Sequence, residues 1–157
     1  RLYGCHENLN KKINLRVIKI LKEEKKNKLL LLEGYDKLQK NCKQIKNQLL
    51  EFLIDKKNKK KLVVGYGAAA KGNTLLNYCK INHNLLKYVY DAAPSKQNKY
   101  LPGSHILIKK PTEIIKDRPD YVFILPWNIK GEILKQLGHL KKKGVVFFTA
   151  KNGIKIL

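Results

Sequence analysis

The apolar positions in the first sixty residues repeat with the period of a helix. Five of them recur at alternating steps of four and three residues: Leu38, Cys42, Ile45, Leu49 and Phe52. This spacing places the five side chains on one face of a helix, which we predict to run from about Leu31 to Lys56. A polar stretch from Lys11 to Lys26 is also predicted to be helical. We interpret the apolar face as a packing surface.

The pattern changes after a lysine-rich stretch at residues 56–61, where short β-branched runs begin. We therefore divide the chain into a long helical segment, residues 1–60, and a second domain, residues 61–157. The strands predicted in the second domain are residues 62–64, 86–91, 106–108, 121–125 and 145–149. Helices are predicted at residues 71–81, from Pro111, and from an N-cap at Asn128 to about Lys142. This alternation predicts an α/β fold with a mainly parallel sheet and flanking helices.

The chain is strongly basic, with a formal net charge of +22 from 34 Lys and Arg against 12 Asp and Glu. Only Arg1, Arg16 and Arg118 are arginine, and the lysines are spread along the chain. Because arginine is favoured where a protein makes bidentate contacts with phosphates, we interpret the lysines as surface residues. A basic module that binds nucleic acid stays an alternative, and it predicts affinity that falls steeply with salt.

The apolar runs and the cysteines indicate a cytoplasmic protein. The longest apolar run, Leu29 to Leu32, is far shorter than the roughly 18 residues of a membrane helix. Cys5, Cys42 and Cys79 have no metal-binding spacing, so free thiols in a reducing compartment are expected. The chain begins with Arg1 and contains no methionine, and we expect it to be a fragment of a longer protein.

A glycine-rich loop follows the first predicted strand. Gly65, Gly67 and Ala70 fit the spacing G-x-G-x-x-G/A, and Asp91 stands at the end of the second strand. Lys71, Gly72, Asn73 and Thr74 open the helix that follows, whose N-terminal N–H groups favour an anion. The predicted ligand is a nucleotide that carries phosphate, bound by a Rossmann-like domain. Two alternatives remain open: an NAD(P)-binding domain of an oxidoreductase, and a turn that requires glycine for packing alone.

Three segments carry a resemblance to a known family. Residues 65–78 read GYGAAAKGNTLLNY, residues 90–106 contain Pro94, Lys96, Gln97 and the run YLPGSHI, and residues 117–128 read DRPDYVFILPWN. Together with Arg1-Leu2-Tyr3 at the start, they resemble the C-terminal domain of S-adenosylmethionine-dependent sugar C-methyltransferases. Asn98 stands where that family usually has glycine.

The resemblance implies that this domain binds the nucleotide diphosphate of a nucleotide-linked keto-deoxysugar. It also implies an upstream zinc module and an upstream methyltransferase domain that holds S-adenosylmethionine and contacts this domain. Residues 1–60 would then link the two domains, and no catalytic or metal-binding residue would lie in this chain.

The resemblance and the glycine loop together nominate twelve substrate-binding residues. They are Gly65, Gly67, Lys71, Gly72, Asn73, Thr74, Asp91, Lys96, Tyr100, His105, Trp127 and Asn128. Three of them also have structural interpretations: Asp91 can stabilise the turn before Pro94, His105 can be a solvated loop residue, and Trp127 can belong to the core.

Overall fold

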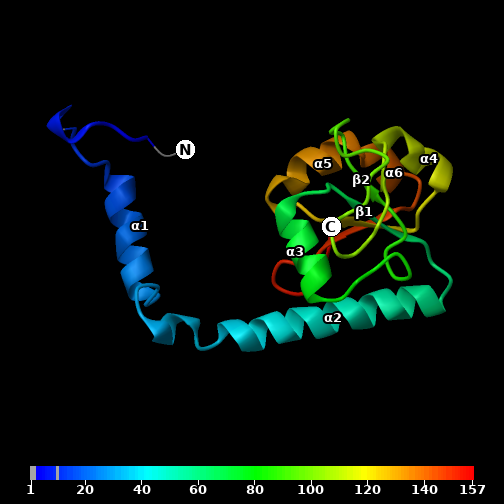
Figure 1. The fold of residues 1–157 in the computed structure, drawn as a ribbon, viewed down its shortest axis with the longest axis horizontal. Coiled ribbons are helices and arrows are strands. Elements are labelled where there is room, and N and C mark those ends of the chain that lie inside the picture. The colour runs from blue at the N-terminus through cyan, green and yellow to red at the C-terminus, as the bar shows by residue number, and fades with distance from the viewer. Residues whose placement is uncertain (1–2, 10) are drawn as a thin grey trace. The chain divides into compact units, whose positions relative to one another are not determined.

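The computed structural model describes residues 3–9 and 11–157, and it divides into two compact units, one that ends at Lys40 and one from Asn41 to Leu157 (Figure 1). The first unit contains the 3-10 turn η1 (Glu7–Leu9), helix α1 (Leu15–Lys26) and the 3-10 turn η2 (Leu32–Tyr35), and none of these buries a residue. Helix α1 starts later than predicted because Asn14 is its N-cap, accepting a hydrogen bond from the Arg16 N–H at 2.9 Å. Arg1 and Leu2, part of the resemblance, lie outside the described residues.

Helix α2 (Leu38–Asn58) begins seven residues after the predicted start at Leu31. The preceding residues form η2 instead, and the Tyr35 hydroxyl donates to the Leu29 carbonyl at 2.8 Å. Leu49 and Leu53 of α2 are fully buried. The second unit begins at Asn41 and includes most of α2. The sequence analysis placed the domain boundary later, between residues 60 and 61.

The six strands of the second unit form one sheet in the order β3-β2-β1-β4-β5-β6. They are β1 (Val63–Tyr66), β2 (Val89–Tyr90), β3 (Ile108–Lys109), β4 (Tyr121–Ile124), β5 (Val146–Thr149) and β6 (Lys155–Ile156). The first five are parallel, and β6 runs antiparallel to β5. This order is that of Rossmann-type folds, so the predicted mainly parallel Rossmann-like sheet is confirmed. Strand β6 was not predicted, because its two residues carry no pattern.

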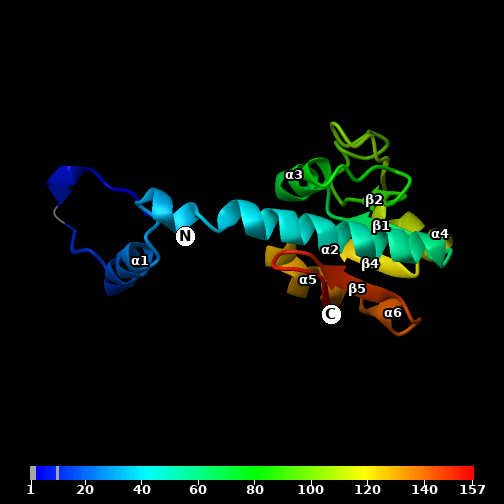
Figure 2. The same cartoon turned by 90° about the horizontal axis from the view of Figure 1, so that it is seen from below.

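Helices cover both faces of the sheet. On one face, α2 and α3 (Ala70–Tyr78) pack with Val63, Phe123 and Phe148 in a buried cluster. On the other face, α4 (Ile114–Asp117), α5 (Lys130–Gln136) and α6 (Gly138–Lys141) pack with Val64, Val122 and Phe147. Figure 2 shows α2 lying against the sheet, next to β1 and β4. Side chains of adjacent residues in each strand thus point to opposite faces of the sheet, and both faces are buried by helices. This explains why the strands are almost continuously apolar.

The predicted N-cap at Asn128 is wrong. The Ile129 N–H donates to the Pro126 carbonyl three residues earlier, at 3.1 Å, so the chain forms the 3-10 turn η4 (Trp127–Ile129). Asn128 lies inside this turn, and Ile129 is the residue before α5. The predicted long helix is accordingly divided into η4, α5 and α6. Pro111 likewise opens a 3-10 turn, η3 (Pro111–Glu113), ahead of α4.

No helix among residues 3–9 and 11–157 has the length and apolar character required to cross a bilayer.

Candidate functional site

The strand order reverses between β1 and β4, and open α/β sheets bind ligands in the crevice at such a point. The segments that leave these two strands touch each other here. Gly67 has φ +88°, and a Cβ at this residue would lie 2.6 Å from Pro126 Cδ. A Cβ at Gly72 would lie 2.6 Å from Leu125 Cβ. Packing against the end of β4 therefore explains both glycines, and neither one alone indicates a ligand.

Gly65 is also explained by packing, because a Cβ at this residue would lie 2.9 Å from Val89 Cγ2 on the neighbouring strand β2.

Asp91 and Lys96 hold the glycine loop. The buried Asp91 carboxylate accepts hydrogen bonds from the Ala68 N–H at 2.6 Å and from the Ala93 N–H at 2.8 Å. The Lys96 ammonium donates to the Ala68 carbonyl at 2.9 Å and lies 3.4 Å from Asp91 Oδ2. The structure thus supports the turn-stabilising interpretation of Asp91. A ribose would have to compete with these loop contacts for the same carboxylate, which counts against the NAD(P)-binding alternative.

Lys71, Thr74 and Trp127 lie together beside the crevice. All three line a pocket of about 480 Å³, and the Lys71 ammonium is 5.6 Å from the centre of the Trp127 ring. The other lining residues are Cys42, Ile45, Leu75, Tyr78, Ala150, Lys151 and Asn152. The position of Trp127 agrees with the rule that ligand-binding residues follow the carboxyl ends of the strands.

The N-terminus of α3 supplies further polar groups to this region. Ala69, the N-cap residue, offers no side-chain acceptor, so no side chain caps the N–H groups of the first turn. The Thr74 hydroxyl donates to the Ala70 carbonyl at 3.1 Å. The Asn73 side-chain oxygen is buried and has no hydrogen-bond partner among the described residues. This end of the helix therefore combines backbone N–H groups that no side chain of the described residues caps with the charge of Lys71.

Asn128 lies in a neighbouring pocket of about 560 Å³ that shares Trp127, Lys151 and Asn152 with the first. Its remaining lining residues are Lys130, Thr149, Gly153, Ile154 and Lys155. Trp127 thus borders two pockets of different character, one with an almost wholly apolar surface and one with polar and apolar surface in similar measure.

Tyr100 and His105 lie in a separate loop. Tyr100 is 61% exposed and bridges to Leu107, and His105 is exposed with φ +50°. Neither residue lines the two pockets beside Trp127. The Asn77 side chain attaches this loop to α3 by donating to the Pro102 carbonyl at 3.0 Å. Asn98 has φ +60°, a conformation that asparagine tolerates, so the loop is formed without the glycine usual in the resembling family.

The sequence analysis missed two contributions to the pocket lining. Cys42 and Ile45 come from α2, which was assigned to the linker. Lys151 and Asn152 follow β5. The latter pair could have been found, because the carboxyl ends of parallel strands share one edge of a sheet.

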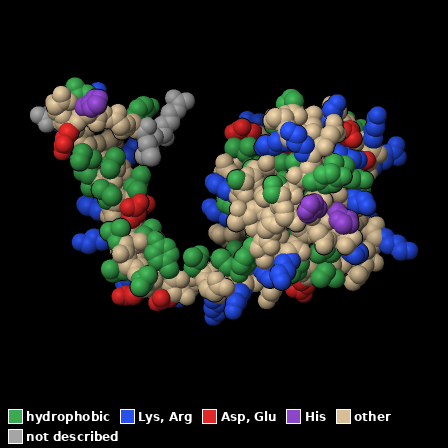
Figure 3. Space-filling model, in the orientation of Figure 1, with side chains coloured by type: hydrophobic (Ala, Val, Ile, Leu, Met, Phe, Trp, Pro, Cys, Tyr) green, Lys and Arg blue, Asp and Glu red, His purple; other side chains and the backbone are tan. Residues whose placement is uncertain are grey.

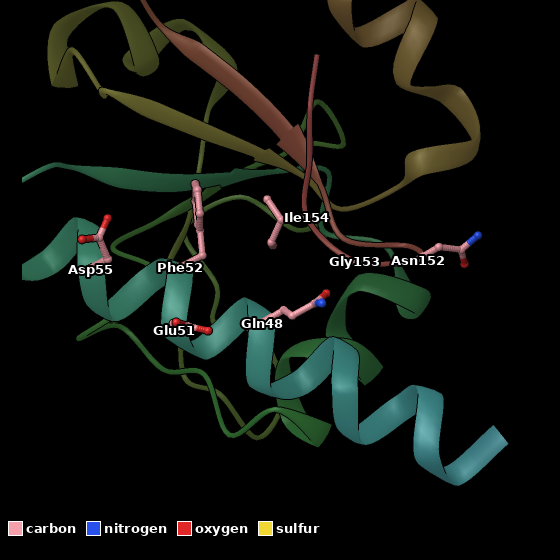
Figure 4. Close-up of a pocket in the computed structure, with 7 residues that line it drawn as sticks. All are labelled: Gln48, Glu51, Phe52, Asp55, Asn152, Gly153 and Ile154. Carbon is pink, nitrogen blue, oxygen red and sulfur yellow. The ribbon is translucent and has the colours of Figure 1, made fainter. Parts of the chain in front are cut away.

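A larger pocket of about 620 Å³ lies between α2 and the segment after β5 (Figure 4). Gln48, Glu51 and Asp55 line it from α2, and no predicted site residue is among its lining residues. Asp55 is contacted by Lys56 at 2.7 Å and Lys59 at 2.8 Å, and the hydrogen bond from Lys56 is the main reason that the pKa of Asp55 is lowered. Two carboxylates in this wall make the pocket a poor site for a diphosphate.

The described residues contain no group of three or more His, Cys, Asp or Glu side chains that could hold a metal ion. The lysines are scattered over the face of the second unit shown in Figure 3, and no single basic patch stands out on that face.

Comparisons with known proteins agree with the motifs. Residues 1–150 match the family described as the C-methyltransferase C-terminal domain. The chain is 32% identical over 118 residues to the C-methyltransferase NovU of Streptomyces niveus, an alignment that covers 75% of this chain and 28% of that protein. The solved structure of UDP-D-quinovosamine 4-dehydrogenase from Vibrio fischeri overlaps 62% of this chain and 93% of that one, with a TM-score of 0.46 and 20% identity.

Proposed function

Because the chain belongs to the family of C-methyltransferase C-terminal domains, we propose that its second unit binds the nucleotide diphosphate of a nucleotide-linked keto-deoxysugar. The domain would hold this substrate for a methyltransferase domain that supplies S-adenosylmethionine, the methyl donor. Neither that donor nor zinc is assigned to residues of this chain. A cytoplasmic location is part of the same proposal, and Cys5, Cys42 and Cys79 are all free thiols.

One observation carries the proposal: the Lys71 ammonium stands at the first turn of α3, beside the crevice where the strand order reverses. A diphosphate at this point would meet the free N–H groups of α3 and a mobile positive charge, which is the usual arrangement for phosphate binding. Trp127 lies 5.6 Å from the same ammonium and offers a flat surface to the rest of the ligand. Asp91 and Lys96 act on the ligand indirectly, by holding the loop in place.

Calorimetric titration of the chain with dTDP, UDP, inorganic pyrophosphate and NAD tests the proposal. The nucleoside diphosphates and pyrophosphate are expected to bind. Lys71→Ala should lower the affinity for the nucleoside diphosphates and for pyrophosphate by roughly ten- to a hundredfold, because a hydrogen bond to a charged group contributes about 1.5–3 kcal/mol. Lys135→Ala removes the same charge from the exposed surface of α5 and serves as the matched control.

The proposal is wrong if none of dTDP, UDP and pyrophosphate binds. It is also wrong if Lys71→Ala and Lys135→Ala lower the affinity for these ligands equally. Equal losses would mean that the overall charge of +22 attracts any anion.

A further inference from the structure

The two pockets that share Trp127 differ in the chemistry of their lining residues. The pocket of about 480 Å³ has apolar walls from α2 and α3, namely Cys42 and Ile45 on one side and Leu75 and Tyr78 on the other. The pocket of about 560 Å³ presents an amide, a hydroxyl and ammonium groups, from Asn128, Thr149 and Lys151 among others. A nucleotide sugar also has two different ends, a flat aromatic base and a hydroxylated sugar ring.

We propose that the apolar pocket, called here the α2–α3 groove, binds the nucleobase, while the second pocket, whose lining is more polar, takes the sugar. This inference rests on the proposed function, because it assumes that the diphosphate lies at Lys71. Lys71 lines the groove and also approaches the ring of Trp127, one of three residues that both pockets share, so a diphosphate held there stands beside both pockets. The two ends of the ligand then extend into the two pockets that Trp127 borders.

The walls of the groove suit a base better than a sugar. Aromatic surfaces stack on nucleobases, and both Trp127 and Tyr78 line the groove. Its volume lies within the range usual for small-ligand pockets. A sugar hydroxyl placed between Ile45 and Leu75 would lose its hydration against two apolar side chains, which is unfavourable. The Lys46 ammonium lies 5.7 Å from the centre of the Tyr78 ring and adds positive charge near that residue.

Trp127 is the only tryptophan in the chain, so its fluorescence reports directly on a ligand beside it. The experiment is a titration of the full chain with UDP, dTDP and pyrophosphate, followed by this fluorescence and by calorimetry. We expect both nucleoside diphosphates to bind about tenfold more tightly than pyrophosphate, because stacking of one base on an aromatic side chain contributes enough free energy for such a difference.

Ile45→Asn tests the groove itself. Ile45 is partly buried and lies on α2, whereas Lys71 lies in the first turn of α3. The substitution adds no charge beside Lys71, so it should bring the affinity for UDP and dTDP down to that for pyrophosphate and leave pyrophosphate binding unchanged. Ile54→Asn, the same change at an exposed residue of α2 that lines neither pocket, is the control and should leave UDP binding unchanged. If Ile45→Asn fails to give a cooperative unfolding transition, Tyr78→Ala, at a residue 40% exposed, replaces it with the same expectation.

The outcomes separate the two proposals. If pyrophosphate and the nucleoside diphosphates bind equally tightly, or if the groove variant leaves UDP binding intact, the base lies elsewhere and the diphosphate site stands. If Asn128→Ala, in the second pocket, weakens UDP binding while Ile45→Asn does not, the orientation of the ligand is reversed. Absence of binding by all three ligands overturns the proposed function and this inference with it.

Discussion

Asp91→Asn distinguishes a residue that holds the glycine loop from one that binds ribose. The carboxylate accepts hydrogen bonds from two backbone N–H groups, those of Ala68 and Ala93, in a position that is only 9% exposed. An asparagine can keep one of them with its carbonyl oxygen, but its NH₂ group then faces the other N–H. The loss of one bond to a charged acceptor, with a buried donor left unpaired, should lower the free energy of unfolding by about 2–3 kcal/mol.

Urea unfolding followed by Trp127 fluorescence measures this loss. With an m value of about 1–3 kcal/mol/M, the midpoint should fall by roughly 1 M or more. Asp55→Asn is the matched control, because the Asp55 carboxylate is exposed and pairs with Lys56 and Lys59, so the substitution should move the urea midpoint much less than Asp91→Asn does. The reasoning is refuted if both variants unfold at the same midpoint. An Asp91→Asn variant with unchanged stability and lost NAD binding would favour the dinucleotide alternative.

Two further predictions concern stability. Gly67→Ala should lower the free energy of unfolding by about 1–3 kcal/mol, because φ is +88° and the new Cβ would meet the Pro126 ring; Gly131→Ala, which has open space, should not be destabilising in the same urea experiment. Partial burial raises the pKa of Asp117, but hydrogen bonds from Lys109 and Tyr90 lower it more, and the net shift is downward. Asp117 therefore stabilises the fold above the pKa of the unfolded state, and this contribution is lost as the pH falls through the lower pKa of the folded state. Asp117→Asn should flatten the decline in melting temperature below about pH 4, and an unchanged decline would contradict the assignment.

The five parallel strands of the sheet were predictable because each falls in a short apolar run rich in β-branched or aromatic residues, whereas β6 (Lys155–Ile156) has no such run. The roles of Asp91 and Lys96 were less so, because both depend on contacts with Ala68, far from them in the chain. Sequence motifs mark such residues as a set without saying which ones face the ligand. The placement of α2 was missed for a related reason: the apolar stripe predicts that the helix packs, but not on which surface.

The position of α2 also connects the core to the proposed site. Phe52 packs edge-on against Tyr121 of β4, with ring centres 5.7 Å apart, and tilted against Phe148 of β5, with centres 4.8 Å apart. These contacts hold α2 against β4 and β5, the two strands whose carboxyl ends lead to Trp127 and Lys151. Ile45, two turns earlier on the same helix, is thereby placed as a wall of the α2–α3 groove. The residues that bury α2 in the core thus fix one side of the proposed nucleobase site, whereas the proposed diphosphate site at Lys71 needs only the loop and α3.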